Sequence, residues 1–430
     1  MAQQTRTDDS EHQLKAATRN LTAAQLFAFA AAAREHGDFK TAEAAYRALS
    51  EHGNIQLRAE ARFRLGMMLA DDEHHYREAA VEFRTILDEN PHATRVRLEL
   101  ARMNALLGES AVAQRELRSA AADGLPSEVA QTIRFYANAL EARRKIGGGF
   151  EIALALDSNV NRATRASSLG TVIGNFTLNP DAQASSGVGL TLRGQSFVRS
   201  RLGQRVNLLS QLSGQANLYR DNDFNDIILS PRIGPEIHAG KDKIQVLAGP
   251  AWRWYGGALY TRSIAASGNW LHPMGARSQL RVDGGYDHID NQRNNLEAGE
   301  SYSLSLGLDH AMAARLGGGV QFSGVRQTAN DPGYATASGG VSGFLYRDTG
   351  KTTFVLGLGY SHLEADKRLA LFPVRRIDDR FSANLSGTFR LLRLGSWAPV
   401  ARVRYERNRS TLTLYDYSRI AAEFGFSAAF

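Results

Sequence analysis

The chain has 430 residues, a formal net charge of +7 and no cysteine. The lack of cysteine excludes a disulfide framework, a thiolate metal site and cysteine catalysis. Its 51 Lys and Arg residues form no basic block with interleaved aromatic residues, so nucleic-acid binding is not indicated. No run of 18 apolar residues occurs, which excludes a helical membrane protein but not a β-barrel, whose strands alternate apolar and polar side chains.

A change in composition divides the chain near residue 147. Up to about Arg144 the sequence is rich in Ala, Arg, Glu and Leu, whereas after Gly147-Gly148-Gly149 it is rich in Gly, Ser, Tyr, Phe and Asn. We therefore predict an α+β two-domain protein. It comprises a disordered or frayed segment over residues 1–20, a helical-repeat domain over 21–146 and a β-barrel over 147–430.

The helical domain shows a repeated pattern. A turn at Gly37-Asp38-Phe39 is followed by Ala42 and Tyr46, and Ala79 and Phe83 repeat these positions about 37 residues later. Small residues where helices touch, with an aromatic residue four positions on, resemble tetratricopeptide repeats. This resemblance implies a short tetratricopeptide-like α-solenoid whose concave face binds peptides or protein segments.

From Phe150 onward the hydrophobic period changes from 3.6 to 2, which indicates strands. Phe150, Ile152, Leu154 and Leu156 alternate with smaller or polar residues, and similar segments of roughly ten residues recur to the end of the chain. We predict a 14-stranded antiparallel transmembrane β-barrel, because short and long connections alternate and an even number returns both ends to one side. Long loops belong outside the cell, so both ends and the repeat domain are expected in the periplasm.

The last predicted strand is strongly amphipathic. Ile420, Phe424, Phe426 and Phe430 share one face, with Glu423 among the residues on the other. A terminal aromatic residue on such a strand resembles the signal that is read by the outer-membrane barrel assembly machinery. We therefore expect Phe426 and Phe430 to form the barrel-assembly signal.

Charged residues fall on the opposite face of the strands from the apolar sets. They are tolerable only in a wet or mutually paired interior, so we expect them to line the lumen. Two interpretations remain open: a structural ion-pair network, which we favour for most of them, and an electrostatic lining that binds a translocating substrate. The candidate lumen-lining and substrate-binding residues are Arg193, Arg232, Glu236, Arg253, Arg281, Asp283, Arg402, Arg404, Glu406, Arg419 and Glu423.

No catalytic constellation is found in the sequence. It contains no HExxH, no phosphate-binding glycine loop and no recognisable Ser/His/Asp spacing. The expectation is a protein that is not an enzyme and that uses no catalytic residue, metal or cofactor.

The element Asp157-Ser158-Asn159-Val160-Asn161 follows the first predicted strand. Together with the domain order and strand count, this Asp-Ser-Asn-x-Asn element resembles the surface lipoprotein assembly modulator (Slam) family, with Asp157, Ser158, Asn159 and Asn161 as the family-like motif. The resemblance implies an outer-membrane translocator that moves a surface lipoprotein or related secreted protein from the periplasm to the cell surface. Its expected partners are that substrate, periplasmic chaperones, the barrel assembly machinery and outer-membrane lipid.

This location requires export across the inner membrane. The first residues contain no basic segment followed by an apolar one, so we infer that a signal peptide has been removed.

Two other functions fit the same architecture. An exopolysaccharide export channel also joins helical repeats to an outer-membrane barrel, but such channels usually have more strands and longer repeat arrays. An anion-preferring diffusion porin would use the arginine-rich lining for selectivity.

Overall fold

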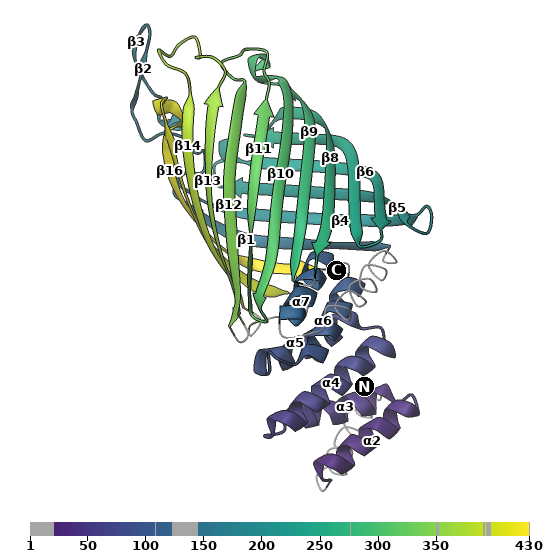
Figure 1. The fold of residues 1–430 in the computed structure, drawn as a ribbon. Helices are drawn as coiled ribbons and strands as arrows, with labels where there is room; N and C mark the ends of the chain where they lie inside the picture. Colours follow the sequence, from purple (N-terminus) through teal and green to yellow (C-terminus); the bar gives the residue numbers. More distant parts are fainter. Residues whose placement is uncertain are drawn as a thin grey trace, which may run out of the picture. The chain divides into compact units, whose positions relative to one another are not determined.

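The computed structural model describes residues 21–107, 109–122, 145–275, 277–349, 352–389, 392 and 397–429. The chain divides into two compact units, residues 1–104 and 105–430 (Figure 1). The predicted N-terminal segment 1–20 lies outside the described residues. The predicted domain boundary at residue 146 remains a prediction.

The first unit is helical. Its helices are α2 (Ala23–Glu35), α3 (Phe39–Ser50), α4 (Ile55–Asp71) and α5 (Tyr76–Glu89), and α6 (Thr94–Leu106) crosses into the second unit. Side-chain caps start three of them: Thr22 forms a capping box for α2, Asp38 accepts a hydrogen bond from the Thr41 amide, and Asn54 accepts from the amides of Gln56 and Leu57. No helix in the described part of the chain is long and apolar enough to cross a membrane.

Small and aromatic residues fill the helix contacts as their spacing predicted. Ala42, Ala79 and Phe83 are fully buried, and Tyr46 is almost so. Gly66 of α4 faces Phe83 of α5 so closely that an added Cβ would lie 2.7 Å from the ring atom Cε1. The absence of a side chain at residue 66 therefore sets the distance between these two helices. The assignment to tetratricopeptide repeats remains a prediction.

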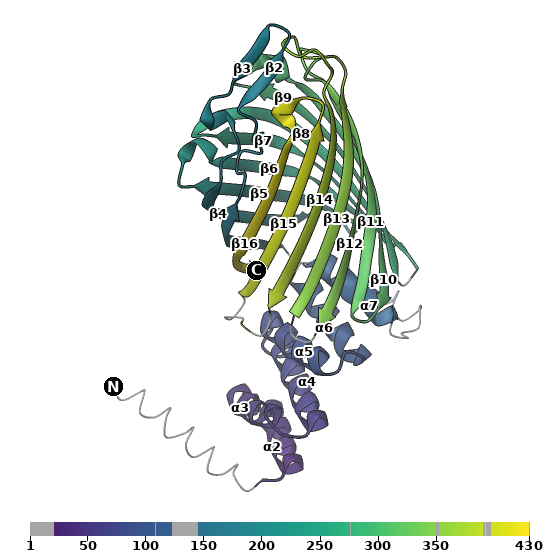
Figure 2. The same cartoon turned by 90° about the vertical axis from the view of Figure 1, so that its left-hand side faces the viewer.

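In the second unit, fourteen strands of the described chain close into an antiparallel barrel, as predicted (Figures 1 and 2). Each strand pairs with its neighbours in sequence, and β1 closes the barrel by pairing with β16 from Gly149↔Ala429 to Asp157↔Ala421. The strands are β1 (Ile146–Asp157), β4 (Gly187–Arg201), β5 (Val206–Tyr219), β6 (Asp226–Ala239), β7 (Asp242–Tyr255), β8 (Ala258–Met274), β9 (Ser278–Asn291), β10 (Gly299–Ala313), β11 (Leu316–Gln327), β12 (Thr336–Thr349), β13 (Thr352–Ala365), β14 (Ile377–Phe389), β15 (Ala398–Ser410) and β16 (Tyr417–Ala429).

The outer face of the barrel is apolar. Large side chains at alternate strand positions are exposed there, for example Leu154, Leu304, Phe322 and Leu358 at 58 to 62%. Because successive strand residues point to opposite faces, the polar residues between them point into the lumen. An exposed apolar band around a polar interior is the arrangement that a lipid bilayer requires of a barrel.

The two ends of the barrel differ. We call the end where β1 begins and β16 finishes the turn end, and the opposite end the loop end. At the loop end β2 (Ser168–Thr171) and β3 (Gly174–Thr177) form a separate hairpin, which stands beyond the rim in Figures 1 and 2. Its Leu169 packs with Leu369, Phe372 and Leu412, and this small apolar cluster joins three loops.

Candidate functional site: the charged wall of the lumen

All eleven charged residues proposed from the sequence occupy inward positions of the strands. They alternate with the exposed apolar residues along each strand, and successive strand residues point to opposite faces. The register between neighbouring strands determines which of these side chains lie close together. Most of them belong to separate ion-pair networks.

The first network crosses the seam between β1 and β16. Glu423 on β16 accepts hydrogen bonds from Arg193 on β4 at 2.8 Å and from Arg402 on β15. Glu151 on β1 pairs with the same two arginines at 2.7 and 3.1 Å. Two arginines and two carboxylates thus link four successive strands on the lumen side, and every charge has opposite partners.

A second network lies on the same seam nearer the loop end. Arg419 on β16 pairs with Asp157 on β1 at 2.6 Å and with Glu406 on β15 at 3.1 Å. Glu406 also pairs with Arg162, which follows β1 and has a left-handed backbone with φ of 48°. Arg404 lies between the two networks and borders the same cavity as Arg193 and Arg419.

The family-like motif anchors the loop end of β1. Asp157 accepts from the Asn159 amide at 2.9 Å, and the fully buried Asn159 donates to Ala163 O at 2.9 Å and Ser418 O at 3.2 Å. The Ser158 hydroxyl accepts from the Ile420 amide at 2.8 Å. Asn161 reaches across its loop, donating to Gln183 O at 2.7 Å and accepting from the Ser185 amide at 3.2 Å. These contacts give the motif a structural role in joining β1, β16 and the first loop.

A third group surrounds Glu236 near the turn end. This carboxylate is fully buried and accepts from Arg199 at 2.8 Å and from Gln245 at 2.7 Å. Lys243 lies 3.4 Å away, so two cations face one anion. The charge is paired and its lone pairs are used, as a buried carboxylate requires.

The remaining proposed residues are dispersed. Arg253 pairs with Asp226 at 2.8 Å. Arg281 contacts Asp283 at 3.4 Å and donates to Gln321 at 3.0 Å. The hydrogen bonds of Arg232 go to the hydroxyls of two serines, Ser230 at 3.2 Å and Ser267 at 3.0 Å.

A polar cavity of about 440 Å³ opens between these groups on the loop-end half of the lumen. Two acidic residues, Asp226 and Glu423, border it together with arginines from several strands and loops. The cavity lining is therefore positively charged overall, which suits anionic groups. The arginines are Arg162, Arg193, Arg253, Arg293, Arg404 and Arg419.

Across β10 to β14, one inward-facing row of the lumen wall is uncharged and consists mainly of small residues. This cross-strand row starts beside Arg281 and returns to the charged side at Glu406. Between its charged ends the row contains Gly307, Gln321, Ser342, Gly359 and Ser382.

Helix α7 (Ser110–Ala122) contacts inward-facing residues at the turn end. Arg118 donates to Gln279 on β9, the Ser119 hydroxyl lies 3.4 Å from the Tyr346 hydroxyl on β12, and the Arg115 guanidinium lies 5.3 Å from the Tyr346 ring centre. Burial lowers the pKa of Arg118 from its usual value. The helix is therefore held to the lumen wall by polar and cation–π contacts.

Sequence reasoning missed several partners in these networks. Glu151 alternates with the apolar residues of the first strand, so the alternation that identified Arg193 as an inward residue would also have identified Glu151. Arg199 and Lys243 become recognisable only when the register brings them to Glu236. Of the expected assembly signal, Phe426 lies on the outer face and is 39% exposed, whereas Phe430 lies outside the described residues.

Comparison with known proteins gives one family. The model of the family described as "Surface lipoprotein assembly modifier" matches residues 147–430. A curated relative, surface lipoprotein assembly modifier 1 of Haemophilus influenzae, is 23% identical over 215 residues. That match covers 49% of this chain and 42% of the relative, so it spans less than half of the relative's length.

Solved structures with some likeness are outer-membrane barrels. OmpT of Vibrio cholerae is 9% identical, with a TM-score of 0.38 over 66% of this chain and 99% of that chain. A FadL homologue of Pseudomonas aeruginosa is 10% identical, with a TM-score of 0.40 over 68% and 91%. At these scores the likeness supports no statement about function.

Proposed function

Because the chain belongs to the surface lipoprotein assembly modifier family and lies in the Gram-negative outer membrane, we propose that it moves a surface lipoprotein or related secreted protein from the periplasm to the cell surface. The observation that carries the proposal is the family match, which runs from Gly147 in β1 through the last strand of the barrel. With the long loops outside the cell, the turn end faces the periplasm and the loop end faces the exterior.

In this proposal the polypeptide passes along the polar wall of the lumen. The seam side holds paired charges, and the row between Arg281 and Glu406 presents serine hydroxyls and glycines. Hydrogen bonds to an extended chain can exchange along such a wall without a deep binding site. The charged candidate residues then act as lining, with Arg193, Arg253, Arg404 and Arg419 bordering the cavity that a substrate crosses.

We assign a gating role to α7 in this process. Its contacts with Gln279 and Tyr346 place a helix against the wall at the periplasmic end of the pore. A substrate that displaced α7 would break a few polar contacts, each worth about 1 kcal/mol. The sequence contains no nucleotide-binding glycine loop. Directionality therefore comes from substrate folding at the surface, from periplasmic chaperones and from the barrel assembly machinery.

Surface display tests the proposal. The full chain is co-expressed with a candidate surface lipoprotein, and intact cells are treated with a protease that cannot cross the outer membrane. Cleavage of the lipoprotein only when the full chain is present supports translocation. A lipoprotein that stays protected in intact cells, but is cleaved after lysis, contradicts it. Heat-modifiable gel mobility of the barrel confirms that the channel itself is folded.

An anion-preferring porin is the second candidate, because arginine predominates around the loop-end cavity. Conductance in a planar bilayer separates the two functions. A porin gives a large, steady and anion-selective current. A translocator that is gated by α7 gives a closed or flickering current.

A further inference from the structure

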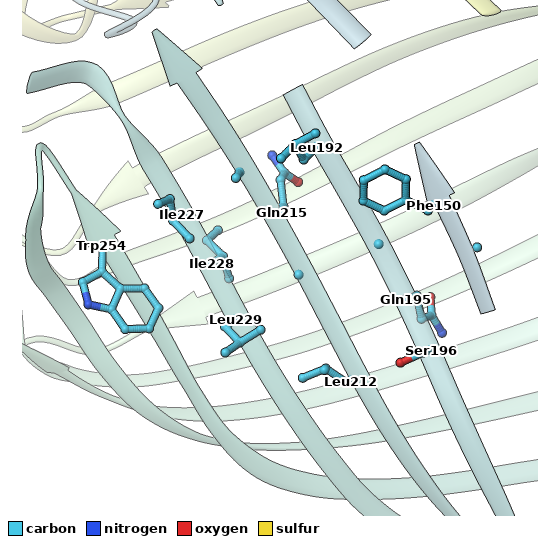
Figure 3. A pocket seen from close by; sticks show the side chains of 14 residues that line it. Phe150, Leu192, Gln195, Ser196, Leu212, Gln215, Ile227, Ile228, Leu229 and Trp254 are labelled. Carbon is cyan, nitrogen blue, oxygen red and sulfur yellow. The ribbon is translucent and has the colours of Figure 1, made fainter. Parts of the chain in front are cut away.

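The outer face of the barrel carries an apolar groove of about 440 Å³ on the strands next to the seam (Figure 3). Its floor is a cross-strand row in which Gly194 of β4 and Gly214 of β5 are neighbours. Phe150 of β1 closes one end of this row and Leu229 of β6 the other. A second row at the loop-end side, with Leu192, Ala216, Ile227 and Trp254, forms the wall.

The two floor glycines are not required by the backbone. Neither has a positive φ angle. A Cβ at Gly214 would meet its nearest atoms at 3.6 Å, and one at Gly194 would meet Phe150 at 3.4 Å, which are ordinary van der Waals contacts. Glycine weakens a strand interior relative to a residue with a side chain, and it often marks a place where a ligand approaches the strand closely. The space above these two glycines is therefore a candidate ligand site.

Position fixes the chemistry of the occupant. Phe150, Leu212 and Ile227 around the groove are exposed on the lipid-facing surface, so only hydrocarbon can fill it in the membrane. The groove also rises across the bilayer. Phe150 is the fifth residue of β1 from the turn end, whereas Leu229 is the fourth residue of β6 from the loop end. A tilt of about 40° lets a cross-strand row climb in this way.

We propose that this groove binds an acyl chain of the lipoprotein substrate while the attached polypeptide passes through the lumen. The inference rests on the proposed function. Acyl chains are excluded from a lumen lined by arginine and carboxylate, because each methylene would lose its apolar surroundings. The outer wall beside the β1–β16 seam offers them a continuous apolar path from the periplasmic half of the bilayer toward the exterior.

Photocrosslinking tests the groove. The full chain in lipid nanodiscs is exposed to a synthetic triacylated lipopeptide with a diazirine in one acyl chain, and labelled residues are mapped by mass spectrometry. We expect labelling of the groove to exceed that of the outer face around Gly324 roughly tenfold. Gly214→Leu, which fills the floor, should reduce groove labelling roughly tenfold. Gly324→Leu is the matched control, since a Cβ at this outward glycine has its nearest neighbour at 3.9 Å.

Two further arms keep the result decisive. A phosphatidylethanolamine carrying the same diazirine should label both faces alike, and equal enrichment in the groove would make it a general lipid site and overturn the proposal. Ala216→Leu fills the wall and replaces Gly214→Leu if that variant lacks heat-modifiable mobility. Unchanged lipopeptide labelling in a folded groove variant also overturns the proposal. If wild-type cells display the lipoprotein while the groove stays unlabelled, only the groove inference fails; if they do not display it, the proposed function fails.

Discussion

Removing the negative charge of Glu423 should weaken the barrel at its seam. In Glu423→Gln the carboxylate that accepts from Arg193 at 2.8 and 3.0 Å and from Arg402 becomes neutral. Breaking a buried pair costs about 3–5 kcal/mol. Because the two arginine side chains are 27 and 21% exposed and glutamine keeps one accepting oxygen, we expect a loss of about 2–4 kcal/mol in unfolding free energy.

Urea unfolding in lipid vesicles, followed by heat-modifiable mobility, measures this change. The matched control is Asp283→Asn, whose ion pair with Arg281 is longer at 3.4 Å, whose side chain is 40% exposed and whose hydrogen bonds with Asn269 and Ser305 an amide can retain, so at most about 1 kcal/mol should be lost. A double-mutant cycle with Arg402→Gln should give a coupling of about 1–3 kcal/mol. A loss below about 1 kcal/mol for Glu423→Gln, or no coupling in the cycle, would refute a seam held by these charges.

The remaining predictions concern the helices and the pore mouth. Gly66→Ala should destabilise the helical unit by about 1–3 kcal/mol in thermal unfolding, although alanine favours helix, because its Cβ meets the Phe83 ring at 2.7 Å; adding Phe83→Leu should restore part of the loss. Asn54→Ala should cost about 1 kcal/mol by removing the cap of α4, and faster amide exchange at the start of that helix alone would locate the effect. Tyr346→Ala should turn a flickering current into a larger, steadier one by releasing α7, whereas Tyr302→Ala on the outer face should leave it unchanged.

The barrel could be predicted from the sequence because its period-two pattern is local. Leu154 and Leu156 identify their face within one strand, and an even strand count follows from alternating turns and loops. The segments around Thr261 and Ser338, whose glycines and serines weaken the period-two pattern, also form full strands, because backbone hydrogen bonds to both neighbouring strands hold them in register.

The candidate site was less accessible to sequence reasoning. Inward position follows from alternation, but pairing depends on register between strands that are distant in sequence. Glu151 and Arg402 are 251 positions apart and meet only because β1 closes on β16. The motif at Asp157 had a similar limit, since its contacts with Ser418 and Ile420 give it a structural role that the local residues did not reveal.

The row from Gly307 to Ser382 limits which substitutions the lumen tolerates. An added side chain would first meet a neighbour, since a Cβ would lie 3.2 Å from the Arg281 guanidinium at Gly307 and 2.8 Å from the Ser382 hydroxyl at Gly359. Along the seam, a substitution of an arginine or a carboxylate changes the charge balance of the ion-pair networks. Added bulk is therefore restricted along the row and loss of charge along the seam, so the two parts of the lumen wall constrain substitution in different ways.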